Sequence, residues 1–233
     1  MIQDREFIHV CVPGEWFCSV WLNHFSVMLT GLLAKYVVQA SYAYSSNVYC
    51  TRHDLARSVI ETSKEHRPEY VLWLDDDNLV TPAQVEQLLN DLREHPEIDM
   101  VVGWSVIQPD VVEMPGECSC GDQRNGLNHR FSTQEVMEFP GLREVTHSGF
   151  PLVVMRYDML EKLGPKAFNP LLDSSPRGFM GEDFAFCTRA RQNGFKIFCD
   201  TRIQVPHLKL RAIVAGTVPA IRVITRDEDE VAA

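Results

Sequence analysis

Residues 69–77 read EYVLWLDDD, a continuous apolar run that stops abruptly at three consecutive aspartates. An apolar run without alternation is typical of a central strand in a parallel sheet, because both faces of such a strand are covered. Shortly after it, Thr81, Pro82 and Gln84 supply a capping residue, a proline at the first helical position and a glutamine three residues after the cap. The stretch therefore predicts a strand, a carboxylate-bearing loop and a helix.

The same alternation of strand and helix extends in both directions along the chain. Short apolar runs bounded by turn residues predict strands, and longer amphipathic or apolar stretches predict helices. We expect strands at 7–12, 37–44, 69–74, 100–107, 150–156 and 196–199, and helices at 16–36, 52–66, 82–92, 157–163 and 182–193. This order predicts an α/β fold with a mainly parallel sheet flanked by helices, in which ligands lie outside the carboxyl ends of the strands.

Residues 108–142 break this pattern. Pro, Gly, Asn, Asp and Cys dominate the segment, and no hydrophobic period is sustained. A long loop or flap is therefore expected, and since structureless loops of this length are uncommon inside compact domains, we expect it to have a function. The hypothesis is a lid that closes over a bound ligand and excludes water.

Composition limits the classes of function. The chain has 233 residues, with 22 Lys and Arg against 32 Asp and Glu, so its formal net charge is −10. Hydrophobic residues make up 45%, which excludes a disordered chain, and the acidic balance argues against broad binding to nucleic acid. The longest apolar stretch, residues 20–33, is interrupted by Asn23 and His24. We expect no membrane span and a cytoplasmic location.

The seven cysteines are odd in number and scattered, which favours reduced thiols over a disulfide framework. Cys118 and Cys120 form the only close pair, and with His129 they could supply part of a zinc site. A loop with incidental thiols is the favoured interpretation, because the spacing is short and no fourth ligand is evident. Three tryptophans, Trp16, Trp21 and Trp73, are expected in the core.

Three consecutive aspartates directly after a buried strand repel one another unless a cation or several donors are present. Along an extended chain, Asp75 and Asp77 point to one side and Asp76 to the other, so the first and third can face one ligand together. The alternative is a capped turn in which Asp77 and Asn78 bond to nearby backbone. Both interpretations stay open at this point.

The second half of the chain carries a further set of motifs. Residues 181–187 read GEDFAFC, and they are followed by Arg189, Arg191, Gly194, Phe195, Asp200 and the pair Pro206-His207. Together with the aspartate cluster, this ordered set resembles the nucleotide-sugar-dependent glycosyltransferases of the GT-A fold, and the resemblance extends over residues 7–207. It implies one GT-A-like domain at 1–215, with a Rossmann-like nucleotide-sugar-binding half at 1–107, an acceptor half at 108–215 and a tail at 216–233.

The resemblance also implies a site and its ligands. The donor is expected to be a UDP- or GDP-sugar, the acceptor a hydroxyl on a carbohydrate or other molecule, and the cofactor Mn²⁺, or Mg²⁺ in its place. The expected metal ligands are Asp77, His207 and Asp75, the last as a ligand or a ribose contact. The residues expected to bind the nucleotide sugar are Pro13, Gly14, Arg52, Asp75 and Asp76.

Glu182 and Asp183 are the candidate catalytic pair. In an inverting transferase one carboxylate takes the proton of the acceptor hydroxyl, and the resemblance points to Asp183 for this step and to Glu182 for holding the acceptor. The competing interpretation is simple capping, because carboxylates are favoured at a helix N-terminus. If the enzyme retains configuration, the pair would orient the acceptor or donor instead.

Two other functions remain as alternatives. A nucleotidyltransferase acting on a sugar phosphate would be expected to show a glycine-rich, basic loop after the first strand, and residues 13–16, PGEW, are neither. A non-catalytic nucleotide- or carbohydrate-binding module on the same scaffold would not need the full set of acidic residues. Trp104 could stack on a sugar, but burial is favoured.

Overall fold

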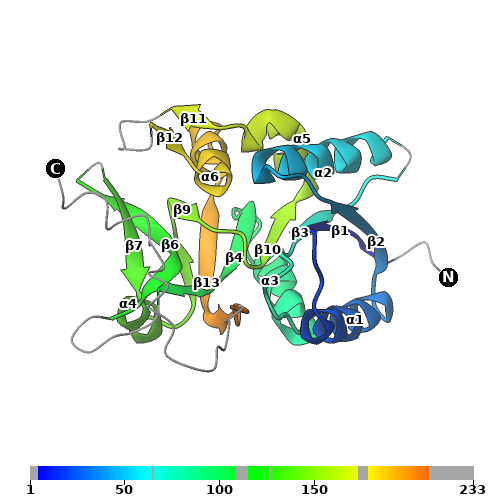
Figure 1. Ribbon diagram of the computed structural model, residues 1–233, viewed down its shortest axis with the longest axis horizontal. Helices are drawn as coiled ribbons and strands as arrows, with labels where there is room; N and C mark the ends of the chain where they lie inside the picture. Colours follow the sequence, from blue (N-terminus) through cyan, green and yellow to red (C-terminus); the bar gives the residue numbers. More distant parts are fainter. Residues whose placement is uncertain (1–4, 65, 109–114, 126, 173–177, 210–233) are drawn as a thin grey trace, which may run out of the picture.

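A seven-stranded sheet in the order β2-β1-β3-β10-β4-β13-β8 forms the centre of the molecule (Figure 1). The computed structural model describes residues 5–64, 66–108, 115–125, 127–172 and 178–209. The strands of this sheet are β1 (Phe7–Pro13), β2 (Val37–Ala43), β3 (Tyr70–Trp73), β4 (Met100–Trp104), β8 (Leu142–Glu144), β10 (Val153–Arg156) and β13 (Ile197–Gln204).

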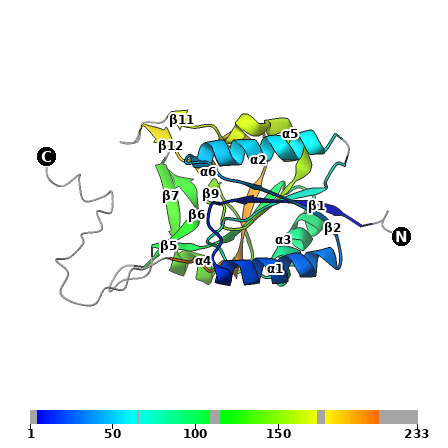
Figure 2. The same cartoon turned by 45° about the vertical axis from the view of Figure 1, so that its right-hand side comes forward.

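Helices cover both faces of this sheet, as Figures 1 and 2 show. On one face lie α1 (Ser19–Leu33) and α3 (Pro82–Glu94), and on the other lie α2 (Val48–Thr62), α5 (Tyr157–Leu163) and α6 (Glu182–Gln192). Each face has its own buried layer, with Trp21, Met28 and Leu88 in one and Leu55 and Phe186 in the other. β3, which lies between β1 and β10, is buried on both sides, as its unbroken apolar run predicts.

Five of the seven strands point the same way. β1 pairs in parallel with β2 and β3, and β4 pairs in parallel with β13. β10 lies antiparallel between β3 and β4, and β8 is antiparallel at the edge. The expected α/β domain with a mainly parallel sheet is therefore confirmed, with one reversed strand at its centre.

Local signals explain several element boundaries. The capping box at Thr81 and Gln84 forms as expected and starts α3. α2 begins at Val48, earlier than predicted, because Asn47 accepts a hydrogen bond from the Tyr49 backbone and caps the helix. This early start places Arg52 within the second turn of α2, where it is buried.

The prediction of a long loop at 108–142 is wrong for most of its length. Residues 109–114 lie outside the described part of the chain, but a hairpin and a short helix follow. The strands of the hairpin are polar and bulged, and register shifts interrupt the alternation of apolar and polar residues. The sequence therefore shows no hydrophobic period of two residues there. The elements are β5 (Val106–Gln108), β6 (Glu117–Arg124), β7 (Leu127–Ser132) and α4 (Thr133–Glu138), and β6 also pairs with β9 (His147–Ser148).

The cysteine pair of this hairpin belongs to the core. Cys118 and Cys120 are fully buried, and the Cys120 sulfur lies 3.6 Å from that of Cys199. His129 faces Glu135 across 3.4 Å. Within the described ranges, no group of three or more His, Cys, Asp or Glu side chains is arranged to hold a metal ion. The zinc alternative is therefore wrong for this pair.

The remaining described elements are short: the 3₁₀ turn η1 (Pro165–Phe168) and the pair β11 (Leu171–Leu172) and β12 (Phe179–Met180). β11 and β12 lie beside α6 in Figure 1, and η1 contacts α2 and α6. Among the described helices, none combines the length and the apolar character needed to cross a bilayer.

Candidate active site

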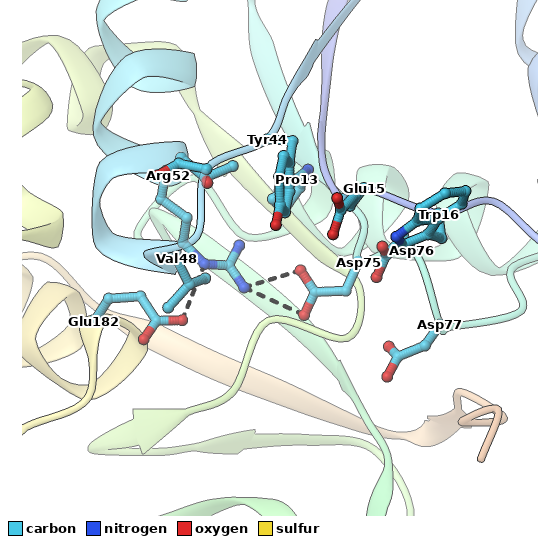
Figure 3. Close-up of a pocket in the computed structure, with 13 residues that line it drawn as sticks. Pro13, Glu15, Trp16, Tyr44, Val48, Arg52, Asp75, Asp76, Asp77 and Glu182 are labelled. Atoms are coloured by element: carbon cyan, nitrogen blue, oxygen red, sulfur yellow. Dashed lines mark hydrogen bonds and ion pairs between the residues drawn. The ribbon is translucent and has the colours of Figure 1, made fainter. Parts of the chain in front are cut away.

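A cavity of about 440 Å³ opens at the carboxyl ends of β1, β2 and β3. Parallel strands end at the same edge of a sheet, so the loops that follow them converge there. Figure 3 shows the side chains that these loops and α2 bring together. The lining residues are Pro13, Gly14, Glu15, Trp16, Tyr44, Ser45, Val48, Thr51, Arg52, Asp75, Asp76, Asp77 and Glu182.

Gly14 and Asp76 fix the loop after β1. The Asp76 carboxylate accepts hydrogen bonds from the backbone of Glu15 and Trp16, and a side chain at Gly14 would overlap that of Asp76. Glycine is therefore required by close approach rather than by its dihedral angles. Burial and the charge of Asp77 raise the pKa of Asp76, and the backbone donors partly offset this effect.

Arg52 lies between the acidic groups of the two halves of the chain. Its Nη2 donates to both carboxylate oxygens of Asp75, at 2.9 and 3.2 Å, and its Nε donates to Glu182 at 3.3 Å (Figure 3). The guanidinium also packs over the ring of Phe150, 4.8 Å from its centroid. Although burial lowers the pKa of Arg52, the neighbouring carboxylates raise it above the ordinary value. The side chain is a buried cation, only 4% exposed.

The Asp75 carboxylate is held on Arg52. Burial raises its pKa to about 6, Arg52 opposes this shift, and the charge of Asp77 adds to it. The backbone carbonyl of Asp75 accepts a 3.0 Å hydrogen bond from the indole of Trp21, which anchors α1 to this loop. The charge of Asp77 disfavours the charged form of Asp75, and a bound cation would relieve this repulsion.

Asp77 faces His207, 130 residues further along the chain. His207 Nε2 lies 2.6 Å from Asp77 Oδ2, and the Leu208 backbone N–H donates to the Asp77 carbonyl at 2.6 Å. His207 follows the end of β13, and its bridge to Asn78 brings the two segments together. Lys209 Nζ lies 3.1 Å from the same imidazole nitrogen.

Asp77 and His207 are a pair of side chains that could hold a divalent transition metal. A carboxylate oxygen and an imidazole nitrogen form a donor pair suited to Mn²⁺, and the Asp77 side chain is 44% exposed, open to a ligand. The third expected ligand, Asp75, is directed to Arg52 instead, so the structure brings together two of the three residues.

The other catalytic candidates open α6. Glu182 lines the cavity and accepts from Arg52, whereas Asp183 lies beyond it, beside Gly149. Asp183 Oδ1 accepts a 2.7 Å hydrogen bond from the Phe184 backbone. Burial, followed by the charge of Glu182, raises the pKa of Asp183 to about 6. A carboxylate with such a pKa can take a proton near neutral pH.

Sequence reasoning missed part of the cavity wall. Trp16, predicted in the core, is 79% exposed because α1 begins only at Ser19, after Cys18 as its cap. Tyr44 is also exposed, and both aromatic side chains stand at the cavity. The turn signal in residues 13–14 was the available hint that Trp16 lies in a loop.

The other tryptophans lie where they were expected. Trp21 and Trp73 are buried in the two core layers. Trp104 is also buried, and its indole donates to the Thr201 carbonyl at 2.9 Å, so it is not available to stack on a sugar.

No protein-family model matches the sequence, and no curated protein sequence matches it. Solved structures do match its fold. The crystal structure of A197 from STIV is 13% identical, with a TM-score of 0.52, and the match covers 91% of this chain and 98% of that one. The crystal structure of GalNAc-T7 with UDP, GalNAc and Mn²⁺ is 14% identical, with a TM-score of 0.50, covering 94% of this chain.

This chain spans 46% of the GalNAc-T7 chain, less than half of it. A structure of CMP:2-keto-3-deoxy-manno-octonic acid synthetase with CTP is 15% identical over 86% of this chain and 90% of that one, with a TM-score of 0.45. At such identities the matches concern the fold, and the chain has a GT-A-like α/β architecture.

Proposed function

We propose that the protein is a metal-dependent glycosyltransferase that moves a sugar from a nucleotide diphosphate sugar to a hydroxyl acceptor. The observation that carries the proposal is the cavity at the carboxyl ends of β1 and β3, where Arg52 connects Asp75 to Glu182. Acidic groups expected on the donor side and on the acceptor side thus meet at one opening.

The donor is assigned to the β1 and β3 loops. Backbone at Pro13 and Gly14 allows a base to approach closely, and the exposed rings of Trp16 and Tyr44 offer surfaces for stacking. The GalNAc-T7 structure, which shares the fold, contains UDP and Mn²⁺. Its ligands support a uridine nucleotide as the first donor to test, with a guanosine nucleotide as the second.

Asp77 and His207 are assigned as the residues that hold Mn²⁺, or Mg²⁺ in its place. The ion would stabilise the negative charge that develops on the departing diphosphate. Asp75 keeps Arg52 in place and, from the cavity wall, can accept from a ribose hydroxyl. Asp76 contributes by holding the loop of residues 13–16 against the cavity.

The acceptor is assigned to the side of α6. Glu182 is fixed by Arg52 and can accept a hydrogen bond from an acceptor hydroxyl. Asp183, with its raised pKa of about 6, can take the proton of the attacking hydroxyl at neutral pH. This assignment applies to an inverting reaction, in which acceptor and leaving diphosphate lie on opposite sides of the sugar.

A thermal-shift panel tests the donor assignment. Purified protein is heated with UDP, GDP, CDP or no nucleotide, each with and without Mn²⁺. We expect one nucleotide to raise the melting temperature only with Mn²⁺, because a ligand that binds the native state stabilises it. The variant Asp54→Asn serves as a control for the loss of one carboxylate away from the cavity. Asp54 lies on the exposed side of α2, so this variant should keep the shift in melting temperature.

A product assay then separates the competing functions. A glycosyltransferase releases a nucleoside diphosphate from a nucleotide sugar, whereas a nucleotidyltransferase releases pyrophosphate from a nucleoside triphosphate and a sugar phosphate. Nucleotide-dependent stabilisation without either product, across a panel of acceptors, would favour the binding module. No stabilisation by any nucleotide would contradict the proposal.

A further inference from the structure

A second opening adjoins the candidate active site. It has a volume of about 610 Å³, and its walls are mainly apolar. It shares Trp16, Asp76 and Asp77 with the first cavity. We call it the α1 groove, lined by Trp16, Phe17, Cys18, Val20, Asp76, Asp77, Leu208 and Lys209.

The surface of α1 beside the groove is unusually poor in charge. Between Glu15 and Lys35 the sequence has no Asp, Glu, Lys or Arg. Trp16, Val20 and Val27 are nevertheless exposed by half or more. A groove and a neighbouring helix surface of this character are typical of a surface that binds another apolar segment.

The described chain ends inside this groove. The hydrogen bond from the Leu208 backbone to the Asp77 carbonyl fixes the exit point, and Lys209 is itself a wall residue. The next residues, 210–226, read LRAIVAGTVPAIRVITR, and an acidic run follows at 227–230. An apolar stretch with three arginines thus begins at the mouth of an apolar groove with two aspartates.

We propose that residues 210–224 of the same chain occupy the α1 groove. The segment is joined to the wall residue Lys209, so its effective concentration at the groove is high and little loop entropy is lost on docking. Its Ile and Val side chains match the apolar walls, and Arg211, two residues from Lys209, can reach Asp76 and Asp77.

The acceptor is a less suitable occupant. Glu182 lies across Arg52 from Asp75, on the far side of the first cavity from the groove (Figure 3). An acceptor bound in the groove would approach from the side of Asp77, away from both candidate acceptor residues. The proposed docking goes beyond the transfer reaction, and it concerns a groove that shares Trp16, Asp76 and Asp77 with the cavity assigned to the donor.

The thiol of Cys18 reports on the groove. Cys18 lines it, and of the seven cysteines only Cys18 and Cys50 are exposed. In the Cys50→Ser protein, the rate of labelling by a maleimide therefore measures access to Cys18 and so to the groove. In the Cys18→Ser protein, the same rate measures access to Cys50 on α2 and serves as the reference. If residues 210–224 cover the groove, Cys18 should be labelled about tenfold more slowly than Cys50.

Variants of the segment make the test specific. In the Cys50→Ser background, Ile213→Asp with Val218→Asp should speed the labelling of Cys18 about tenfold, because charged side chains are disfavoured in an apolar groove. The control, Val231→Asp beyond the acidic run, should leave the rate unchanged. The comparison of Cys18 with Cys50 in the otherwise native chain provides a test even if the double variant misfolds.

Equal labelling of Cys18 in the native chain, the double variant and the control would overturn the proposal. Protection that grows with protein concentration would identify a second copy as the occupant, and protection that appears only with anionic lipid vesicles would identify a bilayer. Either result would also overturn it. The labelling uses no nucleotide, metal or acceptor, so its outcome is separate from that of the proposed function.

Discussion

Asp77 and Asp76 are adjacent in sequence but contact different groups. Asp77 faces His207, whereas Asp76 bonds to the backbone of residues 15 and 16. We predict that Asp77→Ala abolishes the Mn²⁺-dependent nucleotide stabilisation while the protein still folds. At a ligand concentration of about 100 times Kd, the lost stabilisation would be about 2.7 kcal/mol. Thermal unfolding with UDP and GDP, with and without Mn²⁺, measures it.

Asp76→Ala is the matched comparison for Asp77→Ala. It removes an acceptor from two backbone donors, so the free energy of unfolding should fall by about 1–3 kcal/mol even without a ligand. Asp77→Ala should leave the ligand-free stability almost unchanged, since its carboxylate is partly exposed. Unaltered Mn²⁺-dependent stabilisation in Asp77→Ala would remove this residue from the metal site.

The second residue-scale prediction concerns Asp183. Asp183→Asn keeps the size and the hydrogen bond to the Phe184 backbone but cannot take a proton. We expect transfer to fall roughly a hundredfold or more, with nucleotide affinity unchanged. In the native protein the transfer rate should also fall as the pH drops below about 6, because Asp183 becomes protonated there. A steady-state pH profile measures both effects.

Helix capping predicts a different outcome for this variant. Asn caps a helix as well as Asp does, so a residue with only that role would leave turnover, affinity and melting temperature almost unaltered. Full activity of Asp183→Asn would therefore assign Asp183 to the structure of α6 alone.

At the scale of elements, a buried carboxylate pair joins α3 to β13. Asp91 and Asp200 are both buried, and Arg202 donates to each, at 3.0 Å to Asp91 Oδ1 and 2.8 Å to Asp200 Oδ2. Burial raises the pKa of Asp91 from 3.8 to about 6, Gln87 opposes this shift through a hydrogen bond, and Asp200 adds to it. The folded protein therefore binds a proton at Asp91 more readily than the unfolded chain does.

This shift predicts a pH-dependent stability. A raised carboxyl pKa contributes stability that is fully present below pH 3.8 and is lost as the pH rises through about 6. Between pH 7 and pH 5 the native protein should gain about 1 kcal/mol relative to Asp91→Asn, which has no such proton to bind. Urea unfolding of both proteins at the two pH values measures the difference, and equal gains would contradict the assignment.

Local signals predicted the elements that depend on local sequence. The apolar run of residues 69–74 and the capping box at Thr81 specify β3 and α3 without help from distant residues. The hairpin of β6 and β7 was not predicted because its strands are polar and bulged. Its stability comes from pairing with β9 and from the buried Cys118 and Cys120. The pattern Ser132-x-x-Glu135, which caps α4, was a readable signal that the loop interpretation passed over.

The residues of the candidate site also fall into two groups: those with a local sequence signal and those whose contacts depend on the tertiary fold. Motifs identified the aspartate cluster and Glu182, because these carboxylates interrupt or open elements with clear local signatures. The contacts of Arg52 could not be predicted, since they depend on where α2 packs against β3 and α6. Asp77 and His207 are 130 positions apart, and only the family resemblance, not a local signal, placed them in one predicted site. Distances of this kind depend on the assembled sheet.

At the scale of the whole molecule, Arg52 connects the two halves of the chain. Removing a buried ion-pair partner leaves charges uncompensated, so Arg52→Met should lower the free energy of unfolding by roughly 3–5 kcal/mol. The matched control is Arg57→Met on the same helix, where the side chain is half exposed and pairs with Asp54. That change should cost less than about 1 kcal/mol.

Urea unfolding compares the two variants, and Arg52→Lys gives a further control. Lysine keeps the charge but lacks the planar guanidinium whose Nη2 bonds to Asp75 while its Nε bonds to Glu182, so the stability of Arg52→Lys should lie between those of the native protein and Arg52→Met. Similar losses in Arg52→Met and Arg57→Met would show that Arg52 does not hold the halves together.

The reversed strand β10 has a consequence for how the protein is made. β3 and β4 each pair with β10 and are not neighbours of one another. When residues up to 107 have emerged from the ribosome, β4 therefore lacks both of its partners, because β10 and β13 are synthesised later. The nascent chain must wait for residues 153–156 before its sheet can be joined across the middle. Until then β3 and β4 offer open edges, the stage at which a chaperone would be most useful during synthesis.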